Sequence, residues 1–148
     1  MAGVLVDTNV IVYAHDNGEP EKQDRAILTL EHLHGKGAGW LSTQTLAEFF
    51  RVVTGGRRPR LTVAVAAVQV NRLADSWPVL DITPLVVREA VRAVRDHRMA
   101  YWDAQVWATA RLNQIPLVFS EDFSSGASLE GVRFVNPFAA AFDVGAWS

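Results

Sequence analysis

The sequence predicts an α/β fold with a central, mainly parallel sheet of four to five strands flanked by helices. Two observations support this fold class. Short apolar runs of three or four residues, which are typical of buried strands, recur along the chain. They alternate with longer segments of helical periodicity. At 148 residues the chain suits one domain that buries about 70% of its unfolded surface, so we expect a single domain over residues 1–148.

The first elements follow from local signals. Val4–Val6 is a strand-length apolar run, and the cap-type residues directly after it predict a short helix over residues 10–14. A second helix should begin near Pro20 and end at Gly35, because glycine commonly terminates helices. Its apolar stripe comprises Ile27, Leu30 and Leu33.

The remaining elements are expected from apolar runs and helix breakers. The Gly- and Arg-rich segment 55–60 separates two helices, and Pro84 favours the start of a third. In order, we expect a strand at 40–42, helices at 43–53 and 62–75, a strand at 78–81, a helix from Pro84 with the core stripe Val87, Val91 and Val94, a helix at 103–112, and strands at 117–119 and 133–135.

Composition excludes several classes of protein. With 49% hydrophobic and 20% charged residues, the chain has the composition of an ordinary globular protein. It contains no cysteine, which removes disulfides, thiolate zinc sites and cysteine nucleophiles. The N-terminus lacks the basic region of a signal peptide, and no apolar run approaches the ~20 residues of a membrane span. We therefore expect a cytoplasmic protein with no membrane association.

Four acidic residues stand where an apolar run gives way to a turn or a helix start: Asp7, Glu48, Asp103 and Asp122. In a βα alternation such positions fall at the C-terminal edge of the sheet, so we expect these side chains to converge. Two carboxylates about 4 Å apart repel by roughly 4 kcal/mol at an effective dielectric near 20. A cluster of them must therefore hold protons or recruit a hard divalent cation.

Each acid also has a simple local explanation. Asp7 can be a helix N-cap, and Glu48 can close a capping box that begins at Thr45. Asp103 can be a first-turn acid, and Asp122 a turn residue. Four such acids at successive strand exits are harder to explain as separate caps. The four histidines show no metal-binding spacing, and there is no G-x-S-x-G nucleophile motif.

Short segments around these acids carry a family resemblance. They are Val6-Asp7-Thr8-Asn9, Ala47-Glu48-Phe49, Tyr101-Trp102-Asp103-Ala104, Ser120-Glu121-Asp122-Phe123 and Val135-Asn136-Pro137-Phe138. In this order they resemble the PIN-domain family, most closely its small bacterial toxin members, the VapC-like ribonucleases of type II toxin-antitoxin systems. The resemblance implies an endoribonuclease that depends on Mg²⁺ or Mn²⁺ and is held inactive by a cognate antitoxin.

The resemblance also implies roles for individual residues. The four acids would bind the metal and carry catalysis, with supporting roles for Thr8, Asn9, Ser120 and Glu121. Gln105 departs from the family, which usually carries an apolar residue at this position. We expect Gln105 at a helix surface, where it would affect packing more than activity.

Net charge is −2, so contact with RNA must be local. The basic loop residues Arg57, Arg58 and Arg60 are the candidates for RNA binding. Arg88, Arg92 and Arg95 share one helix face, which is either solvated or a phosphate track.

The helix at 62–75 is apolar on more than one face, which predicts a homodimer. Other functions remain open: a housekeeping RNA-processing nuclease of the same family, or a catalytically idle module that binds RNA or protein. A haloacid-dehalogenase-like phosphatase is disfavoured, because Asn9 stands where its second acid belongs and no lysine follows Lys36.

Overall fold

The computed structural model of the chain describes residues 3–147 and contains one six-stranded sheet in the order β3-β2-β1-β4-β6-β5. All strand pairs are parallel except β5 with β6. The strands are β1 (Val4–Val6), β2 (Gly39–Ser42), β3 (Val79–Leu80), β4 (Leu117–Phe119), β5 (Ser128–Leu129) and β6 (Val132–Val135). The predicted α/β class and its mainly parallel sheet are confirmed.

All five expected strands are present, and β5 is an additional strand that was not expected. It is two residues long and pairs with β6 through a tight hairpin. Glu130 and Gly131 in this hairpin both have positive φ, at 47° and 86°. Two consecutive positive φ values are typical of the two-residue turns that match the twist of paired strands. A two-residue strand carries too little apolar periodicity to be recognised in the sequence.

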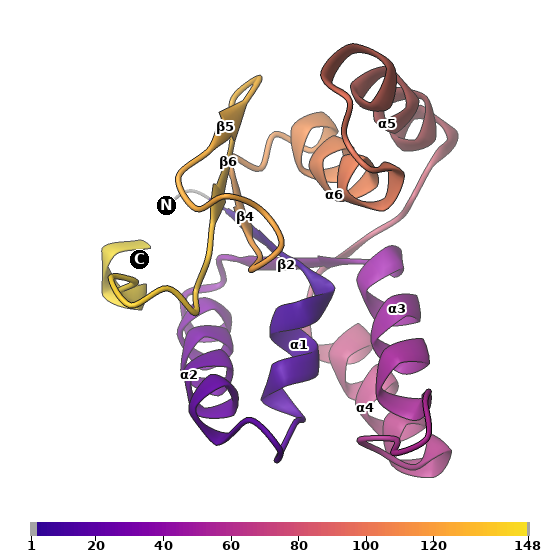
Figure 1. Cartoon of the computed structure of the whole chain (residues 1–148), viewed down its shortest axis with the longest axis vertical. Helices are drawn as coiled ribbons and strands as arrows, with labels where there is room; N and C mark the ends of the chain where they lie inside the picture. The colour runs from indigo at the N-terminus through magenta and orange to yellow at the C-terminus, as the bar shows by residue number, and fades with distance from the viewer. Residues whose placement is uncertain (1–2, 148) are drawn as a thin grey trace.

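Helices cover both faces of the sheet. They are α1 (Thr8–Ala14), α2 (Pro20–Lys36), α3 (Thr43–Thr54), α4 (Val63–Ser76), α5 (Pro84–His97) and α6 (Tyr101–Leu112), followed by a short 3-10 helix, η1 (Val144–Trp147). Figure 1 shows α5 and α6 on one side of the sheet and α1 to α4 on the other. Among residues 3–147, no helix combines the length and apolarity needed to cross a membrane.

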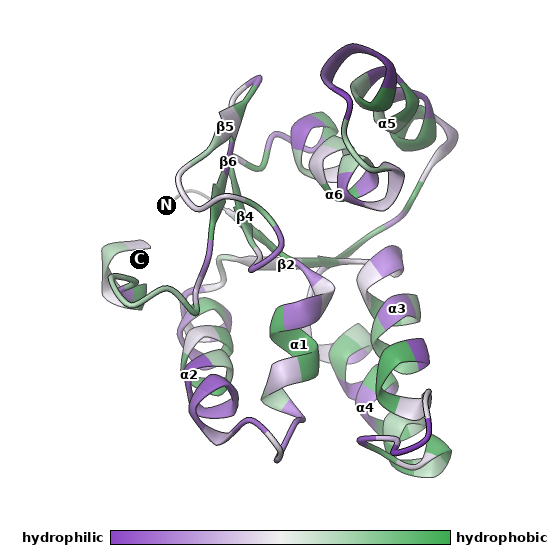
Figure 2. Ribbon diagram, viewed as in Figure 1, coloured by the Kyte–Doolittle hydropathy of each residue, from purple (hydrophilic) through white to green (hydrophobic). Residues whose placement is uncertain are grey.

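Alternation along the strands divides the core into two parts, because successive strand residues point to opposite faces. Val4, Val6 and Phe119 pack against α1, α2 and α3. Leu5 and Val118 face the opposite way and pack with residues of α5 and α6. Figure 2 shows the hydrophobic residues of the central strands between these two helical layers.

The second helix ends one residue later than predicted and is capped by a different glycine. Helix α2 continues through Gly35 to Lys36, and Gly37 forms its C-cap in the left-handed conformation with φ of 63°. The amide of Gly37 donates to the carbonyl of His34. Only the second glycine terminates the helix because only it adopts the left-handed backbone that a C-cap of this kind requires.

The predicted core stripe of α5 was also wrong. Val87, Val91 and Val94 are 38%, 53% and 36% exposed, whereas Val86, Ala90 and Ala93 are buried. The buried set has the same i, i+4, i+7 spacing, one residue earlier. Two alanines in this stripe belong to the same core as the buried alanines of α6, which include Ala104 and Ala108. Small side chains permit close packing of two helices, so packing overrode the hydrophobicity of the valines.

Candidate active site

Asp7 lies at the C-terminal end of β1 and caps α1. Its Oδ1 accepts a hydrogen bond from the Thr8 amide at 2.8 Å, and its Oδ2 accepts one from Ser120 Oγ at 2.8 Å. The side chain is only 6% exposed. Asp7 is therefore an N-cap, as its local explanation predicted. It is also hydrogen-bonded to Ser120, which lies 113 residues later in the chain.

Parallel pairing of β1 with β4 brings Ser120 and Asp122 to Asp7, because Val6 lies opposite Phe119 in the sheet. Ser120 Oγ accepts from Asn9 Nδ2 at 3.0 Å and from the Asp122 amide at 3.1 Å. Asn9 Nδ2 also lies 3.1 Å from Asp122 Oδ2. These bonds form one network at the C-terminal edge of the sheet, where the acids are expected to meet.

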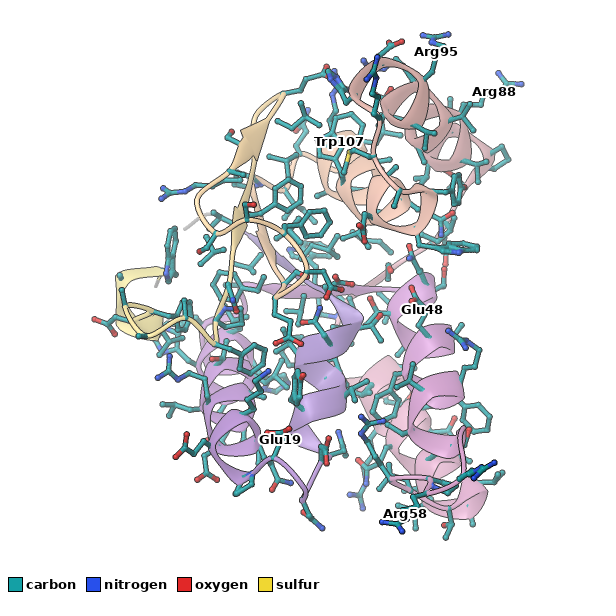
Figure 3. All side chains as sticks on the ribbon, viewed as in Figure 1. Glu19, Glu48, Arg58, Arg88, Arg95 and Trp107 are labelled. Carbon is teal, nitrogen blue, oxygen red and sulfur yellow. The ribbon has the colours of Figure 1, made fainter. Side chains whose placement is uncertain are left out.

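Glu48 comes from the middle of α3 and does not follow a strand. The predicted capping box was wrong: the N-cap of α3 is Ser42, whose Oγ accepts from the Thr45 amide at 3.2 Å. Glu48 lies in the second turn of the helix, where its Oε1 accepts from Gln44 Nε2 at 2.6 Å. In Figure 3 it lies near the sheet-proximal end of α3.

Asp103 also comes from a helix, because it lies in the first turn of α6. The expectation that all four acids stand at strand exits was therefore right for Asp7 and Asp122 and wrong for Glu48 and Asp103. Burial raises the pKa of Asp103, and the charges of Asp122 and Glu48 raise it further. Glu48 and Asp103 therefore interact electrostatically with the acids at the sheet edge, although both lie on helices.

The four acids share an unbalanced negative field. Burial raises the pKa of Asp7 from 3.8 to about 6, and the charges of Asp122 and Glu48 add to this rise. Hydrogen bonds from Ser120 and Thr8 oppose it. Within residues 3–147, none of the four acids forms a salt bridge with lysine, arginine or histidine. Oxygen ligands with uncompensated charge are the donor set that a hard divalent cation prefers.

A cavity of about 200 Å³ lies beside these acids and is lined by Thr8, Asn9, Glu48, Asp122 and other residues. Thr8 Oγ1 is buried without a hydrogen-bond partner among the described residues. An unpaired buried hydroxyl is costly, and a bound cation or its water would satisfy it. Between residues 3 and 147, however, no group of three or more Asp, Glu or His side chains lies close enough to hold an ion in the conformation described. The donor chemistry fits a divalent cation, and binding would have to draw the acids closer together.

Glu121 differs from its neighbour Asp122. Its carboxylate accepts from Tyr13 Oη at 2.8 Å and from Lys22 Nζ at 3.0 Å. A carboxylate that is already paired with a lysine contributes little free negative charge to a metal site. Its amide donates to Asn9 Oδ1 at 3.3 Å, so the backbone of Glu121 supports the network more directly than its side chain does.

The basic residues lie in different places. Arg60 reaches the cavity beside Glu48 and Asp122, and its Nε donates to Asp16 at 2.9 Å. Arg57 and Arg58 are exposed, and Figure 3 shows Arg58 pointing into solvent away from Glu48.

On α5, Arg92 binds Glu89 and Glu130, and Arg95 binds Asp96. Figure 3 shows Arg88 and Arg95 pointing away from the molecule. Because two of the three guanidinium groups are already paired, the helix face is a poor phosphate track.

The expected surface position of Gln105 was wrong. Gln105 is only 6% exposed, and its Nε2 donates to Gln44 Oε1 at 3.0 Å. Its own Oε1 accepts from Tyr101 Oη at 2.8 Å. Because Gln44 donates to Glu48, a hydrogen-bonded chain runs from Tyr101 to the catalytic candidate. The signal was present in the sequence as a polar residue inside an otherwise apolar helix segment.

Comparisons with known proteins identify a family and a shared fold. Residues 4–124 match the sequence profile of the PIN domain. No curated protein matches the chain significantly in sequence.

Several solved structures share the fold. A toxin-antitoxin complex from Klebsiella pneumoniae has 17% identity and a TM-score of 0.64, covering 92% of this chain and 98% of its own. VapBC2 from Rickettsia felis, bound to a promoter DNA fragment, has 14% identity and a TM-score of 0.66, with coverage of 90% and 97%. The sarcin-ricin loop cleaving toxin VapC20 from Mycobacterium tuberculosis has 21% identity and a TM-score of 0.64, with coverage of 88% and 99%.

These identities are low, so the solved structures speak for the fold, whereas the sequence match spans most of the chain. That match establishes that this protein belongs to the PIN-domain family.

Proposed function

We propose that the protein is an endoribonuclease that depends on Mg²⁺ or Mn²⁺, hydrolyses RNA phosphodiester bonds in the cytoplasm and acts as the toxin of a toxin-antitoxin pair. One observation carries the proposal: Asp7 is buried in the field of Asp122 and Glu48, and within residues 3–147 none of these acids forms a salt bridge. Family membership and the fold shared with toxin structures support the same activity.

In this proposal Asp7, Glu48, Asp103 and Asp122 hold the cation and carry catalysis. A bound divalent ion would supply an activated water and relieve charge on the phosphodiester in the transition state. Ser120 and Asn9 position the carboxylates of Asp7 and Asp122 through the bonds at 2.8 and 3.1 Å. Thr8 contributes its unpaired hydroxyl to the same cavity.

We assign RNA binding to Arg57, Arg58 and Arg60, which would hold phosphates by charge without reading bases. Arg60 lies nearest the acids, and its pairing with Asp16 fixes its direction. Arg57 and Arg58 lie in the loop before α4 and would contact RNA farther from the cleaved bond.

We assign two protein partners. The first is a cognate antitoxin, supported by the antitoxin complexes among the structures that share the fold. The second is another copy of this chain. Of the residues of α4, Ala66 alone is fully buried, while Val63, Val65 and Val68 are exposed. Figure 2 shows α4 as a largely hydrophobic helix at the edge of the molecule, and exposed apolar side chains of this kind favour a homodimer contact.

The test is cleavage of a mixed cellular RNA pool by the purified protein with Mg²⁺, with Mn²⁺ and with EDTA, alongside Asp103→Asn. Discrete cuts that need metal and vanish in the variant are expected. If wild type and variant give the same pattern, or if no RNA is cut under any metal, the catalytic proposal fails.

The toxin assignment has its own test. Expression of the wild-type protein should stop growth, and Asp103→Asn should not. Unaffected growth together with metal-dependent cleavage in vitro would favour a housekeeping nuclease.

A further inference from the structure

A second, larger cavity adjoins the acid site. It has a volume of about 660 Å³ and is lined by residues that include Gln44, Glu48, Arg51, Ile82, Trp102 and Gln105. Glu48 lines both this cavity and the smaller one beside Asp122. A ligand in the larger cavity would therefore touch a residue proposed to bind the cation. The volume is within the range of small-molecule sites.

Trp102 forms an aromatic wall of this cavity. Its side chain is 63% exposed, and it meets Tyr101 edge-on at 5.0 Å between ring centroids. It directly precedes Asp103 on α6. A large exposed indole beside a phosphodiester-cleaving site offers a flat surface on which an unpaired base can stack.

Arg51 supplies a free positive charge to the cavity. It lies three residues after Glu48 on α3, so the two side chains occupy the same helix face. Its guanidinium forms no salt bridge with any residue in the described range 3–147. A phosphate next to a bound base is the partner that a guanidinium prefers.

Two carboxamides, each held by hydrogen bonds, contribute to the polar part of the lining. Gln44 Nε2 uses both hydrogens, on Glu48 Oε1 and on the Trp102 carbonyl, and Gln105 Oε1 accepts from Tyr101. Because Gln105 Nε2 donates to Gln44 Oε1, the two amides are adjacent, and a carboxamide can form further bonds through its second N–H and its second lone pair. An adjacent donor and acceptor match the edge of a nucleobase.

We propose that this cavity binds one unpaired nucleobase of the RNA substrate, next to the phosphate that is cleaved. The base stacks on Trp102, its edge meets Gln44 and Gln105, and the adjoining phosphate binds Arg51. This inference rests on the proposed ribonuclease function. An apolar protein side chain fits the same space less well, because it would leave the charge of Arg51 without a partner.

The test uses short single-stranded RNAs that contain the cleaved sequence, with an abasic ribose placed at each position in turn. Wild type should lose roughly 10- to 100-fold in kcat/KM at one position adjoining the cut, because a stacked base contributes about this factor. Trp102→Ala should lose a similar factor on intact RNA and nothing further at the abasic position. Trp102→Phe should retain most of the activity and the abasic penalty.

This double comparison separates stacking from damage to Asp103. If Trp102→Ala cleaves RNA slowly but still loses the full factor in kcat/KM at the abasic position, the substitution acts by disturbing Asp103. That result would overturn the proposal. Arg51→Gln should raise KM, whereas Arg88→Gln, an exposed arginine that points away on α5, should not. If the two substitutions raise KM equally, that result would also count against phosphate binding by Arg51 in the cavity.

A second measurement does not depend on cleavage. The indole N–H resonance of Trp102, assigned from Trp102→Phe, should shift when the same RNA is added to the Asp103→Asn protein, and the abasic RNA should not shift it. If wild type cuts RNA but Trp102 does not respond, the base-binding proposal is wrong and the ribonuclease function stands. If no RNA is cut, the ribonuclease function fails, and a shift of Trp102 would still establish binding.

Discussion

The side-chain amide of Gln105 donates to Gln44 Oε1 at 3.0 Å, across the contact between α6 and α3. Both residues are buried, and Gln44 Nε2 in turn donates to Glu48 Oε1 at 2.6 Å. A helix at the sheet's second face thus fixes an acid on a helix of the first face. Partners of this kind commonly tune the ligands of metal sites.

Leucine is an apolar residue of the kind that the family resemblance predicts at position 105. Gln105→Leu should make the position of Glu48 less well fixed. Gln44 Oε1 would lose its donor, and the free energy of unfolding should fall by about 1–3 kcal/mol. Affinity for Mn²⁺, measured by calorimetry, should fall about tenfold. Tyr101→Phe leaves the Gln44 contact intact and should have a smaller effect. Unchanged Mn²⁺ affinity in Gln105→Leu would show that Glu48 does not depend on this chain of bonds.

The raised pKa of Asp7 predicts how stability depends on pH. Asp7 titrates near 6 in the folded protein and at 3.8 in the unfolded chain, so the folded state holds the proton more tightly. Stability of the metal-free protein should be greatest below about pH 4 for this group. It should fall as pH rises to about 6, by about 3 kcal/mol in total.

Thermal melting in EDTA between pH 4.5 and 8 checks this sign. Asp7→Asn should flatten the profile, because an asparagine does not ionise. Saturating Mn²⁺ should raise the wild-type melting temperature at pH 7.5. A wild-type profile that rises with pH through 6, or no response to Mn²⁺, would contradict a buried carboxylate that shares a cation.

Asp122 and Glu121 should respond differently to loss of charge. Asp122→Asn should reduce cleavage by at least 100-fold, because Asp122 is proposed to bind the cation directly. Glu121→Gln should retain most of the activity and reduce stability by about 1 kcal/mol or less, because its partner Lys22 is partly exposed. Single-turnover cleavage and denaturant unfolding of both variants measure the contrast. Equal catalytic losses would assign Glu121 to the cation site.

Arg57 and Arg58 are predicted to bind phosphate without sequence preference. Replacing both with glutamine should weaken RNA binding similarly for all sequences. The slope of log K against log salt should become shallower by roughly 0.7 for each phosphate of the single strand that the protein no longer neutralises. Fluorescence anisotropy at several salt concentrations measures this slope, and Arg88→Gln is the matched control. An unchanged slope in the double variant would remove the loop from the RNA path.

The exposed valines of α4 predict that a charge at this surface will separate the homodimer. Val65 is 45% exposed, and Val65→Asp should convert the dimer into a monomer by light scattering without a loss of folding. Val91→Asp on α5, at a position 53% exposed, is the matched control and should leave the dimer intact. Dissociation by the control alone would place the contact on α5.

Sequence patterns alone predicted five strands of the six-stranded sheet and the two acids that follow strands. Short apolar runs predicted the strands β1 and β4, and the acids that follow them, Asp7 and Asp122, had to meet because adjacent parallel strands end at one edge. Local rules of this kind depend on backbone geometry, which a few neighbouring residues specify.

The face that each helix buries depends on its packing against elements that are distant in the chain. The α5 valines are more hydrophobic than Ala90 and Ala93, but the alanines are buried because close packing against α6 favours small side chains. Packing also placed Glu48 and Asp103 beside the sheet edge from two helices. Packing also buries Gln105, which was expected at a helix surface, and places it in hydrogen-bond contact with Gln44. Such contacts join residues far apart in the chain, so a local pattern can mark Gln105 as unusual but cannot identify its partner.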